Sequence, residues 1–479
     1  PPAARRDSMR PDNDNSCVPA PTPNKLLMGG IVIASYALIT LLPTPEGLTP
    51  NGQKAIALMA AAVLAWVFEV LPLAAASILF TVLPAVMGVM PLPRVMGHFA
   101  TPILFFLFAM FCTCIAFQNS GLSRRLVVWL SMKSGGSAKR LLFLMMMACG
   151  LLSTILADLP VIAMMMPVAL LVLRENGCRP GCSMYGRAMM LGLPIACLIG
   201  GVGTPAGGSP NMLTIGLLES TANVKISFFE WSIIGLPMVL LLVPAAFGVL
   251  IKVFPPEIEI LEGMEDNYEK LGPMRTEEKR FLLILAVNLL LWSTDRLHGI
   301  PLPAVSVMGG TLFCLPGVGL VNWNRDGGRV GWDIIMLVGA ANALGMIIWE
   351  SGGALWIADR CLGGVASLPL AAIIAGISLF TVVIHLLIPI APALIAVLLP
   401  AVVALAGNMG VSPALLALPM GFSASASLLL PIETITLVTY PAGYYRMFDM
   451  FRPGMLIALC WVAVMTALML LVGRPLGLL

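Results

Sequence analysis

Two apolar stretches decide the fold of this chain: residues 150–173, GLLSTILADLPVIAMMMPVALLVL, and residues 192–214, GLPIACLIGGVGTPAGGSPNMLT. Each is long and apolar enough to enter a bilayer. Each is also interrupted, the first at Asp158-Leu159-Pro160 and the second between Gly200 and Pro210. Proline removes a backbone donor and glycine relaxes a helix. In hydrocarbon, the freed backbone groups are tolerated only where they are buried in protein or line a cavity.

Paired, interrupted apolar segments are typical of the midplane site of a secondary transporter. The alternative is a pair of kinked helices in a passive bundle. An ionisable side chain, Asp158, stands at the first interruption, and carboxylates inside a membrane are expensive to keep. The position of Asp158 therefore favours a functional site.

Composition identifies a helical membrane protein with many spans. The chain has 479 residues, of which 59% are hydrophobic and 11% charged, whereas about a quarter of the residues in a soluble protein are charged. The apolar runs do not alternate in polarity as barrel strands do. A net charge of +3 is too small to indicate nucleic acid. The sequence shows no phosphate-binding loop, nucleophile–base set or metal-ligand cluster, so neither an enzyme nor a metal centre is indicated.

The chain divides into two similar halves at its most charged stretch, residues 254–281. Residues 105–130 end QNSGLSRRLVVWL, and residues 334–361 end WESGGALWIADRC at a similar distance from their apolar start. A proline-interrupted run and a Gly/Ser/Pro-broken segment follow in each half. A weak repeat of this size indicates an inverted-repeat transporter. In the second half, an unbroken span is predicted at about 302–320.

Charge predicts the orientation in the membrane. With the N-terminus in the cytoplasm, and both broken runs returning to their own side, the C-terminus lies outside. Most of the 27 Lys and Arg residues then lie inside, as the positive-inside rule requires. The exceptions are Lys54, Arg94, Lys225, Arg296, Arg360 and Arg474. The expected location is the inner (plasma) membrane of a bacterium.

Nearly the whole chain resembles one family, the divalent anion/sodium symporters, which include dicarboxylate and citrate carriers of the ion-transporter superfamily. The segments that carry the resemblance, in order, are 41–77 (LLPTPEGLTPNGQKAIALMAAAVLAWVFEVLPLAAAS), 103–130 (ILFFLFAMFCTCIAFQNSGLSRRLVVWL), 199–211 (IGGVGTPAGGSPN), 337–358 (LVGAANALGMIIWESGGALWIA), 422–436 (FSASASLLLPIETIT) and 442–454 (AGYYRMFDMFRPG).

The resemblance implies an all-α polytopic membrane protein with an inverted repeat of about 11 transmembrane helices. Two re-entrant hairpins and two broken helices would form a transport domain that moves against a scaffold by an elevator motion, in a homodimer. The implied divisions are a disordered cytoplasmic tail (1–24), the scaffold of the first repeat (25–135), the first hairpin and broken helix (136–253), a charged cytoplasmic linker (254–281), the scaffold of the second repeat (282–365), and the second hairpin, broken helix and last helix (366–479).

The chain departs from the family pattern at the residues that would touch cargo. Members carry Ser-Asn-Thr at each hairpin tip, but here the tips read Ala157-Asp158-Leu159 and Ile390-Ala391-Pro392. The fifth-helix break keeps Gly203, Thr204, Gly207, Pro210 and Asn211. The tenth-helix break, Ala-Thr-Pro-Pro-Asn in the family, reads Glu433-Thr434-Ile435-Thr436-Leu437 and keeps only Thr434. Side-chain donors for a dianion are lost, and two carboxylates are gained.

The expected site combines the hairpin tips with the two breaks. The residues predicted to bind substrate are Asp158, Leu159, Pro160, Gly207, Ser209, Pro392, Glu433 and Thr434. Those predicted to bind a coupling ion are Ser153, Asp158, Gly203, Thr204, Asn211, Ser425 and Glu433. No cofactor is expected beyond Na⁺ or H⁺ as coupling ion, and the expected partners are a small anionic substrate, the bilayer and a second copy of the chain.

Several residues keep an alternative interpretation. Asp158 is a cation ligand, a proton carrier or a helix cap, and Glu433 is a proton site or a carboxylate paired with a polar neighbour. His385 is more often a buried, hydrogen-bonded histidine than a functional one. Glu69 and Glu350 are predicted to lie at a membrane interface.

Three functions remain open. The first is a secondary carrier of a small organic anion, dicarboxylate-like, that is coupled to protons or sodium or exchanges one anion for another. The second is a cation/proton antiporter that uses Asp158 and Glu433. The third is a non-transporting sensor built on a transporter fold.

Overall fold

The computed structural model describes residues 25–261, 273–362 and 368–473. This part of the chain is helical, with one isolated β-bridge between Ser137 and Ile260 and no named strand. The all-α prediction is therefore confirmed. The predicted tail (1–24) and the centre of the predicted charged linker lie outside the described residues.

The first half of the chain contains one helical hairpin, α7–α8, and one broken helix, α9–α10. Its helices are α1 (Lys25–Leu41), α2 (Pro50–Val67), α3 (Leu73–Val86), α4 (Leu92–Phe99), α5 (Pro102–Ser120), α6 (Leu122–Ser134), α7 (Ala138–Ser153), α8 (Asp158–Glu175), α9 (Met184–Gly201), α10 (Ser209–Ala222) and α11 (Phe228–Val253).

The second half follows the same order. Its helices are α12 (Thr276–Ser293), α13 (Asp295–His298), α14 (Leu302–Leu312), α15 (Trp323–Asp326), η1 (Gly327–Arg329), α16 (Trp332–Glu350), α17 (Gly353–Ile357), the π-helical turn η2 (Ala358–Leu362), α18 (Leu370–Ile384), α19 (Ala391–Met409), α20 (Pro413–Ser423), α21 (Thr434–Thr439), η4 (Tyr440–Ala442), η5 (Met447–Met450) and α22 (Phe451–Val472).

Proline and glycine set most of the interruptions close to where the sequence predicts them. The turn between α7 and α8 covers residues 154–157, and the break between α9 and α10 covers residues 202–208. Two predictions were wrong in detail. The second break covers residues 424–433, so Thr434 already begins α21. The predicted span 302–320 ends as a helix at Leu312, because Pro316, Gly317 and Gly319 follow within two turns.

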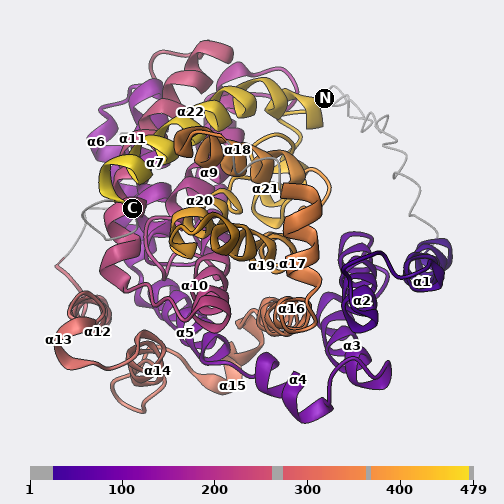
Figure 1. Cartoon of the computed structure of the whole chain (residues 1–479). Helices are drawn as coiled ribbons and strands as arrows, with labels where there is room; N and C mark the ends of the chain where they lie inside the picture. The colour runs from indigo at the N-terminus through magenta and orange to yellow at the C-terminus, as the bar shows by residue number, and fades with distance from the viewer. Residues whose placement is uncertain (1–24, 262–272, 363–367, 474–479) are drawn as a thin grey trace, which may run out of the picture.

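The two broken helices exchange partners with the two hairpins, and Figure 1 shows α10 close to α19. Helix α10, beyond the first break, packs on α19 of the second hairpin. Helix α21, beyond the second break, packs on α8 of the first hairpin and on α9. The four interruptions therefore meet in the middle of the molecule.

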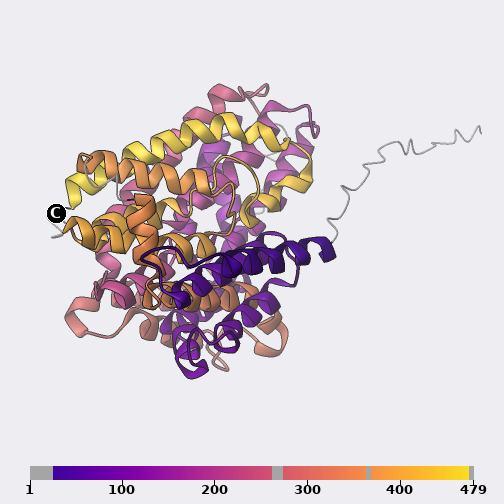
Figure 2. The ribbon, with the colours of Figure 1, turned by 45° about the vertical axis from the view of Figure 1, so that its right-hand side comes forward.

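A second group of helices faces this centre. Helix α16 packs on α2, α3 and α4, and it also touches α10 and α19, so it joins the two groups. Helix α1 lies along the outside against α2 (Figure 2), and most of its apolar side chains are exposed. An exposed apolar face suits contact with lipid.

In the described part of the chain, six helical segments are long and apolar enough to cross a membrane by length and composition. They are Leu92–Ser120, Met184–Gly201, Phe228–Val253, Trp332–Glu350, Ala391–Met409 and Met447–Val472, and five shorter apolar helices accompany them. The protein is an integral membrane protein. The repeat of about 11 spans, the domain limits and the orientation stay predictions.

Two glycines allow the first hairpin to touch the first broken helix. Gly150 of α7 faces Gly200 of α9, and a Cβ on Gly200 would stand 2.2 Å from the Gly150 carbonyl oxygen. Only a residue without a side chain permits this approach. The crossing brings the turn 154–157 against the break 202–208.

A buried carboxylate ties the loop before α16 to the end of α5. The two carboxylate oxygens of Asp326 accept hydrogen bonds from Asn119, Arg325, Arg329 and the Asn322 backbone. The hydrogen bond from Arg325 is the main cause that holds the pKa of Asp326 well below its usual range, against the opposing effect of burial.

Replacing Gly200 by Ala should destabilise the protein, because the added methyl group forces the hairpin away from the break. Overpacking of this kind costs about 1–3 kcal/mol. The measurement is the melting midpoint in detergent, followed by size-exclusion chromatography after heating. The matched control is Gly248→Ala in α11, where nothing lies near the new Cβ. An equal decrease of the melting midpoint in Gly200→Ala and Gly248→Ala would contradict the role of the crossing between Gly150 and Gly200.

Asp326→Asn should lower the melting midpoint by an amount that stays constant between about pH 5 and pH 8. A carboxylate with a lowered folded-state pKa contributes its full stability above its unfolded pKa of about 3.9, and this contribution is lost only as the pH falls through the lower folded value. Glu277→Gln, at an exposed position, is the control. A difference between wild type and Asp326→Asn that shrinks from pH 8 to pH 5 would contradict the assignment.

Candidate substrate and ion site

One cavity of about 230 Å³ lies where the four interruptions meet. Its lining includes eight of the predicted site residues. These are Asp158, Leu159, Gly207, Ser209, Pro392, Ser425, Glu433 and Thr434. The other predicted residues, Ser153, Pro160, Gly203, Thr204 and Asn211, are not part of the lining.

Four helices begin at the wall of this cavity. The residues just before their first turns, Ala157 of α8, Gly208 of α10, Ile390 of α19 and Glu433 of α21, all line it. None of the four N-termini has a side-chain capping hydrogen bond. The first backbone N–H groups of a helix have no partner within the helix, and the helix dipole makes this end positive. The cavity is therefore surrounded by backbone donors suited to an anion.

The two carboxylates also stand at helix N-termini. Asp158 is the first residue of α8 rather than its cap, which is Ala157, so the capping interpretation of Asp158 is not supported. Glu433 directly precedes α21. Asp158 Oδ1 and Glu433 Oε2 are buried and have no hydrogen-bond partner in the described residues. Both carboxylates line the one cavity, which leaves them available to a ligand.

The remaining predicted ion residues form a polar group behind the cavity. Thr204 donates to the Thr154 carbonyl at 2.5 Å and accepts from the Ala206 backbone. Asn211 donates to the carbonyls of Gly201 and Thr204. Asn211 Oδ1 and Ser153 Oγ are buried without a partner in the part of the chain that is described. These oxygens are of the kind that hard cations prefer.

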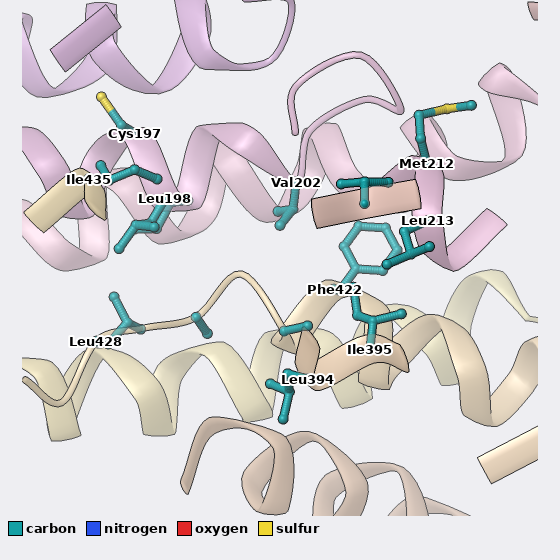
Figure 3. Close-up of a cluster of buried hydrophobic side chains, with 14 of the residues drawn as sticks. Cys197, Leu198, Val202, Met212, Leu213, Leu394, Ile395, Phe422, Leu428 and Ile435 are labelled. Carbon is teal, nitrogen blue, oxygen red and sulfur yellow. The ribbon is translucent and has the colours of Figure 1, made fainter. Parts of the chain in front are cut away.

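Apolar packing holds the breaks in place. Figure 3 shows buried side chains of α9, α10, α19, α20 and α21 gathered in one cluster, with Val202 and Leu428 contributed by the breaks themselves. Trp231 of α11 stacks on Phe422, with ring centroids 4.3 Å apart, and its indole N–H donates to the Val202 carbonyl at 2.8 Å. A carbonyl freed by the first break is thereby satisfied.

The position of His385 indicates a structural role. It caps the C-terminus of α18, is buried, and its Nε2 lies 2.6 Å from the Ala424 carbonyl oxygen at the start of the second break. It joins the second hairpin to the second break without lining the cavity. The more common interpretation, a buried histidine with a hydrogen-bond partner, fits this geometry.

The opposite wall of the cavity was missed by sequence reasoning. It consists of Trp66 and Val67 at the end of α2, Glu69 just after it, Leu73 of α3, Leu107, Met110 and Phe111 of α5, and Ile334 and Leu337 of α16. Glu69 was predicted at a membrane interface but belongs to this wall. The available signal was an acid followed by Val-Leu-Pro between two apolar runs. By contrast, Glu350 lies outside the lining and pairs with Arg94 and His98.

The cavity combines negatively charged side chains with positively polarised backbone groups. Three carboxylates line it, from Glu69, Asp158 and Glu433, and no Lys, Arg or His is among the described lining residues. The positive potential comes from backbone N–H groups alone. The described residues also contain no group of three or more His, Cys, Asp or Glu placed to hold a metal ion.

Comparison of the sequence with known proteins identifies a family of membrane transporters. The family model described as "Sodium:sulfate symporter transmembrane region" matches residues 24–479. A protein of Staphylococcus saprophyticus named sodium-dependent dicarboxylate transporter SdcS is 27% identical, over 85% of this chain and 83% of its own. An uncharacterized transporter of Haemophilus influenzae is 23% identical, over 91% of this chain and 94% of its own.

Solved structures support the fold alone. The MtrF protein of Neisseria gonorrhoeae, described as one of a class of antimetabolite efflux pumps, superposes with a TM-score of 0.55 at 14% identity and covers 94% of this chain and 95% of its own. The YdaH transporter of Alcanivorax borkumensis gives 0.50 at 14% identity, with 95% of this chain and 99% of its own covered.

The family match extends over almost the whole chain and includes both hairpins and both breaks that form the cavity. The protein is not an enzyme but a membrane transporter, and the chain belongs to the sodium:sulfate symporter family.

Proposed function

We propose that this protein is a secondary active transporter of a small, dicarboxylate-like organic anion, coupled to a cation. The observation that carries the proposal is the convergence of four uncapped helix N-termini on one central cavity. Backbone N–H groups at helix ends recognise carboxylates without any basic side chain. The relatives named sodium-dependent dicarboxylate transporters point in the same direction.

The carboxylates of Asp158 and Glu433 explain why a cation must travel with the anion. Two ionised carboxylates beside a dianion repel it by several kcal/mol at the low effective dielectric of a membrane protein. A proton or Na⁺ bound at Asp158 or Glu433 removes this repulsion. Anion and cation then favour each other's binding, which is the thermodynamic basis of coupling. Ser153 Oγ and Asn211 Oδ1 would add neutral oxygen ligands for Na⁺.

An elevator motion fits the two walls of the cavity. One wall comes from the hairpins and broken helices, and the other from α2, α3, α5 and α16. In our proposal, the first wall carries the cargo past the second, which stays in place. The hydrogen bond from Thr204 to the Thr154 carbonyl ties the first turn to the first break behind this wall. The packing of α10 on α19 and of α21 on α8 joins the two halves, so that the first wall can move as one unit. The homodimer stays a prediction.

A second candidate is a cation/proton antiporter. The cavity with three carboxylates and no basic side chain favours it. Proteoliposomes loaded with a pH-sensitive dye separate the two functions. Succinate, citrate or sulfate uptake driven by a sodium or proton gradient supports the anion carrier. Proton movement driven by sodium or potassium, without any organic anion, supports the antiporter and contradicts the main proposal.

Asp158→Asn should reduce gradient-driven anion uptake by about tenfold or more, or leave uptake that no longer responds to the cation gradient. The physical reason is that the neutral amide cannot take up a proton or neutralise Na⁺. Initial rates in proteoliposomes, at several pH values and sodium concentrations, measure this. Asp158→Glu should retain coupling, and Glu277→Gln, at an exposed position outside the cavity, should behave as wild type. An unchanged rate and an unchanged cation dependence in Asp158→Asn would remove this residue from the mechanism.

A further inference from the structure

Glu69 occupies a backbone position that normally favours glycine. Helix α2 ends at Val67, and Glu69 follows with φ +46°. The N–H of Glu69 donates to the Trp66 carbonyl and the N–H of Val70 to the Ala65 carbonyl. These two hydrogen bonds form a Schellman motif, in which the left-handed residue is usually Gly because a Cβ is strained there. Backbone strain at a cavity wall is a reason to look for function.

The charge of Glu69 is also poorly placed for stability. The C-terminal end of a helix is negative, so a carboxylate just beyond α2 is repelled rather than held. The other ionisable residues of the lining are the carboxylates of Asp158 and Glu433. Asp333, which accepts a hydrogen bond from the Ala74 backbone at the start of α3, adds a further negative charge to this side. Glu69 is exposed and lines the cavity, and among the described residues it has no ion pair or side-chain hydrogen bond.

The neighbouring Trp66 offers a second unsatisfied group. Its side chain is 1% exposed, it lines the same cavity, and its indole N–H has no acceptor among the described residues. Buried polar groups are normally hydrogen-bonded. The α2 wall thus presents an unpaired carboxylate beside an unpaired donor and an aromatic ring.

We propose that Glu69 binds an ammonium group of the cargo, so that the carried molecule is an amino dicarboxylate rather than a plain dicarboxylate. The inference rests on the proposed transport function and names its substrate class. The carboxylates of the cargo lie at the helix N-termini of the hairpin and break wall. Its ammonium group lies at the α2 wall against the exposed carboxylate of Glu69, where opposite charge stabilises it.

A bare coupling cation fits this wall less well. Na⁺ requires several oxygen ligands, and the lining residues nearest to Glu69 in the chain, Trp66, Val67 and Leu73, have no side-chain oxygen. An ammonium group needs only one strong acceptor and tolerates aromatic neighbours. The chemistry of the wall therefore favours a cationic part of the cargo over a second ion site.

Two ligand pairs that differ only by an ammonium group test the proposal: succinate with aspartate, and glutarate with glutamate. The purified full-length protein is measured by thermal shift and by uptake into proteoliposomes, with a sodium or proton gradient present. We expect wild type to prefer the amino acid of at least one pair by about tenfold, as a charge-assisted contact allows.

Glu69→Gln should lower this preference to about twofold or less and leave the binding of the plain dicarboxylate unchanged or stronger, because only the charge is lost. Glu69→Gly should lose the preference too, yet melt at a higher temperature, since glycine relieves the left-handed strain. The exposed Glu277→Gln in α12 is the matched control. A purely structural role would change stability without changing the ratio within a pair.

The outcomes distinguish the assignment of Glu69 from the proposed transport function. Uptake of succinate or glutarate without preference for the amino acid overturns the Glu69 assignment and leaves the transport function standing. An unchanged preference in Glu69→Gln overturns it as well. A thermal shift with sodium alone that disappears in Glu69→Gln assigns Glu69 to the coupling ion instead. Folded wild-type protein that responds to none of the four acids counts against both proposals.

Discussion

Backbone N–H groups at the start of a helix must find a partner, and inside a membrane no bulk water supplies one. Here four such helix ends, those of α8, α10, α19 and α21, point to one cavity and lack side-chain caps. Three contacts hold these ends in position. They are the close crossing of Gly150 and Gly200, the hydrogen bond from Trp231 to the Val202 carbonyl, and the contact of His385 with the second break. The fold can be understood as a means of keeping four uncapped helix ends together.

The site combines two kinds of charge that are usually separate. Backbone dipoles supply the positive potential, and the side chains of Glu69, Asp158 and Glu433 supply the negative one. A basic side chain in the same place would hold an anion permanently. Dipoles balanced by carboxylates bind it only when protons, cations or a cationic part of the cargo are present. Such a balance suits a transporter, which has to release its cargo as well as bind it.

The sequence predicts the interruptions well, because proline and glycine act on the local backbone. The start of α8 at Asp158 and of α19 at Ala391 lies within the predicted tips, and the first break falls inside the predicted interval 200–210. The second break was placed too late, because residues 423–430 contain no proline or glycine and their SASAS pattern is compatible with a helix. The local sequence pattern does not show whether such a segment forms a helix or is held as an irregular break by the helices around it.

The cavity wall opposite the hairpins could not be predicted from the sequence. Glu69 lies far along the chain from Asp158 and Glu433, and only the packing of α16 on α2 and α3 brings it to the same cavity. Its left-handed conformation is likewise invisible in the sequence, since glycine is the residue normally expected there. The polar residues behind the cavity were identified through family resemblance, which cannot tell a residue that lines a cavity from one that supports it.

The exchange of partners between the two halves affects how the protein is made. The ends of α8 and α10 are covered by α21 and α19, which leave the ribosome much later. During synthesis, the first hairpin and break therefore wait in the membrane with their polar backbone unshielded.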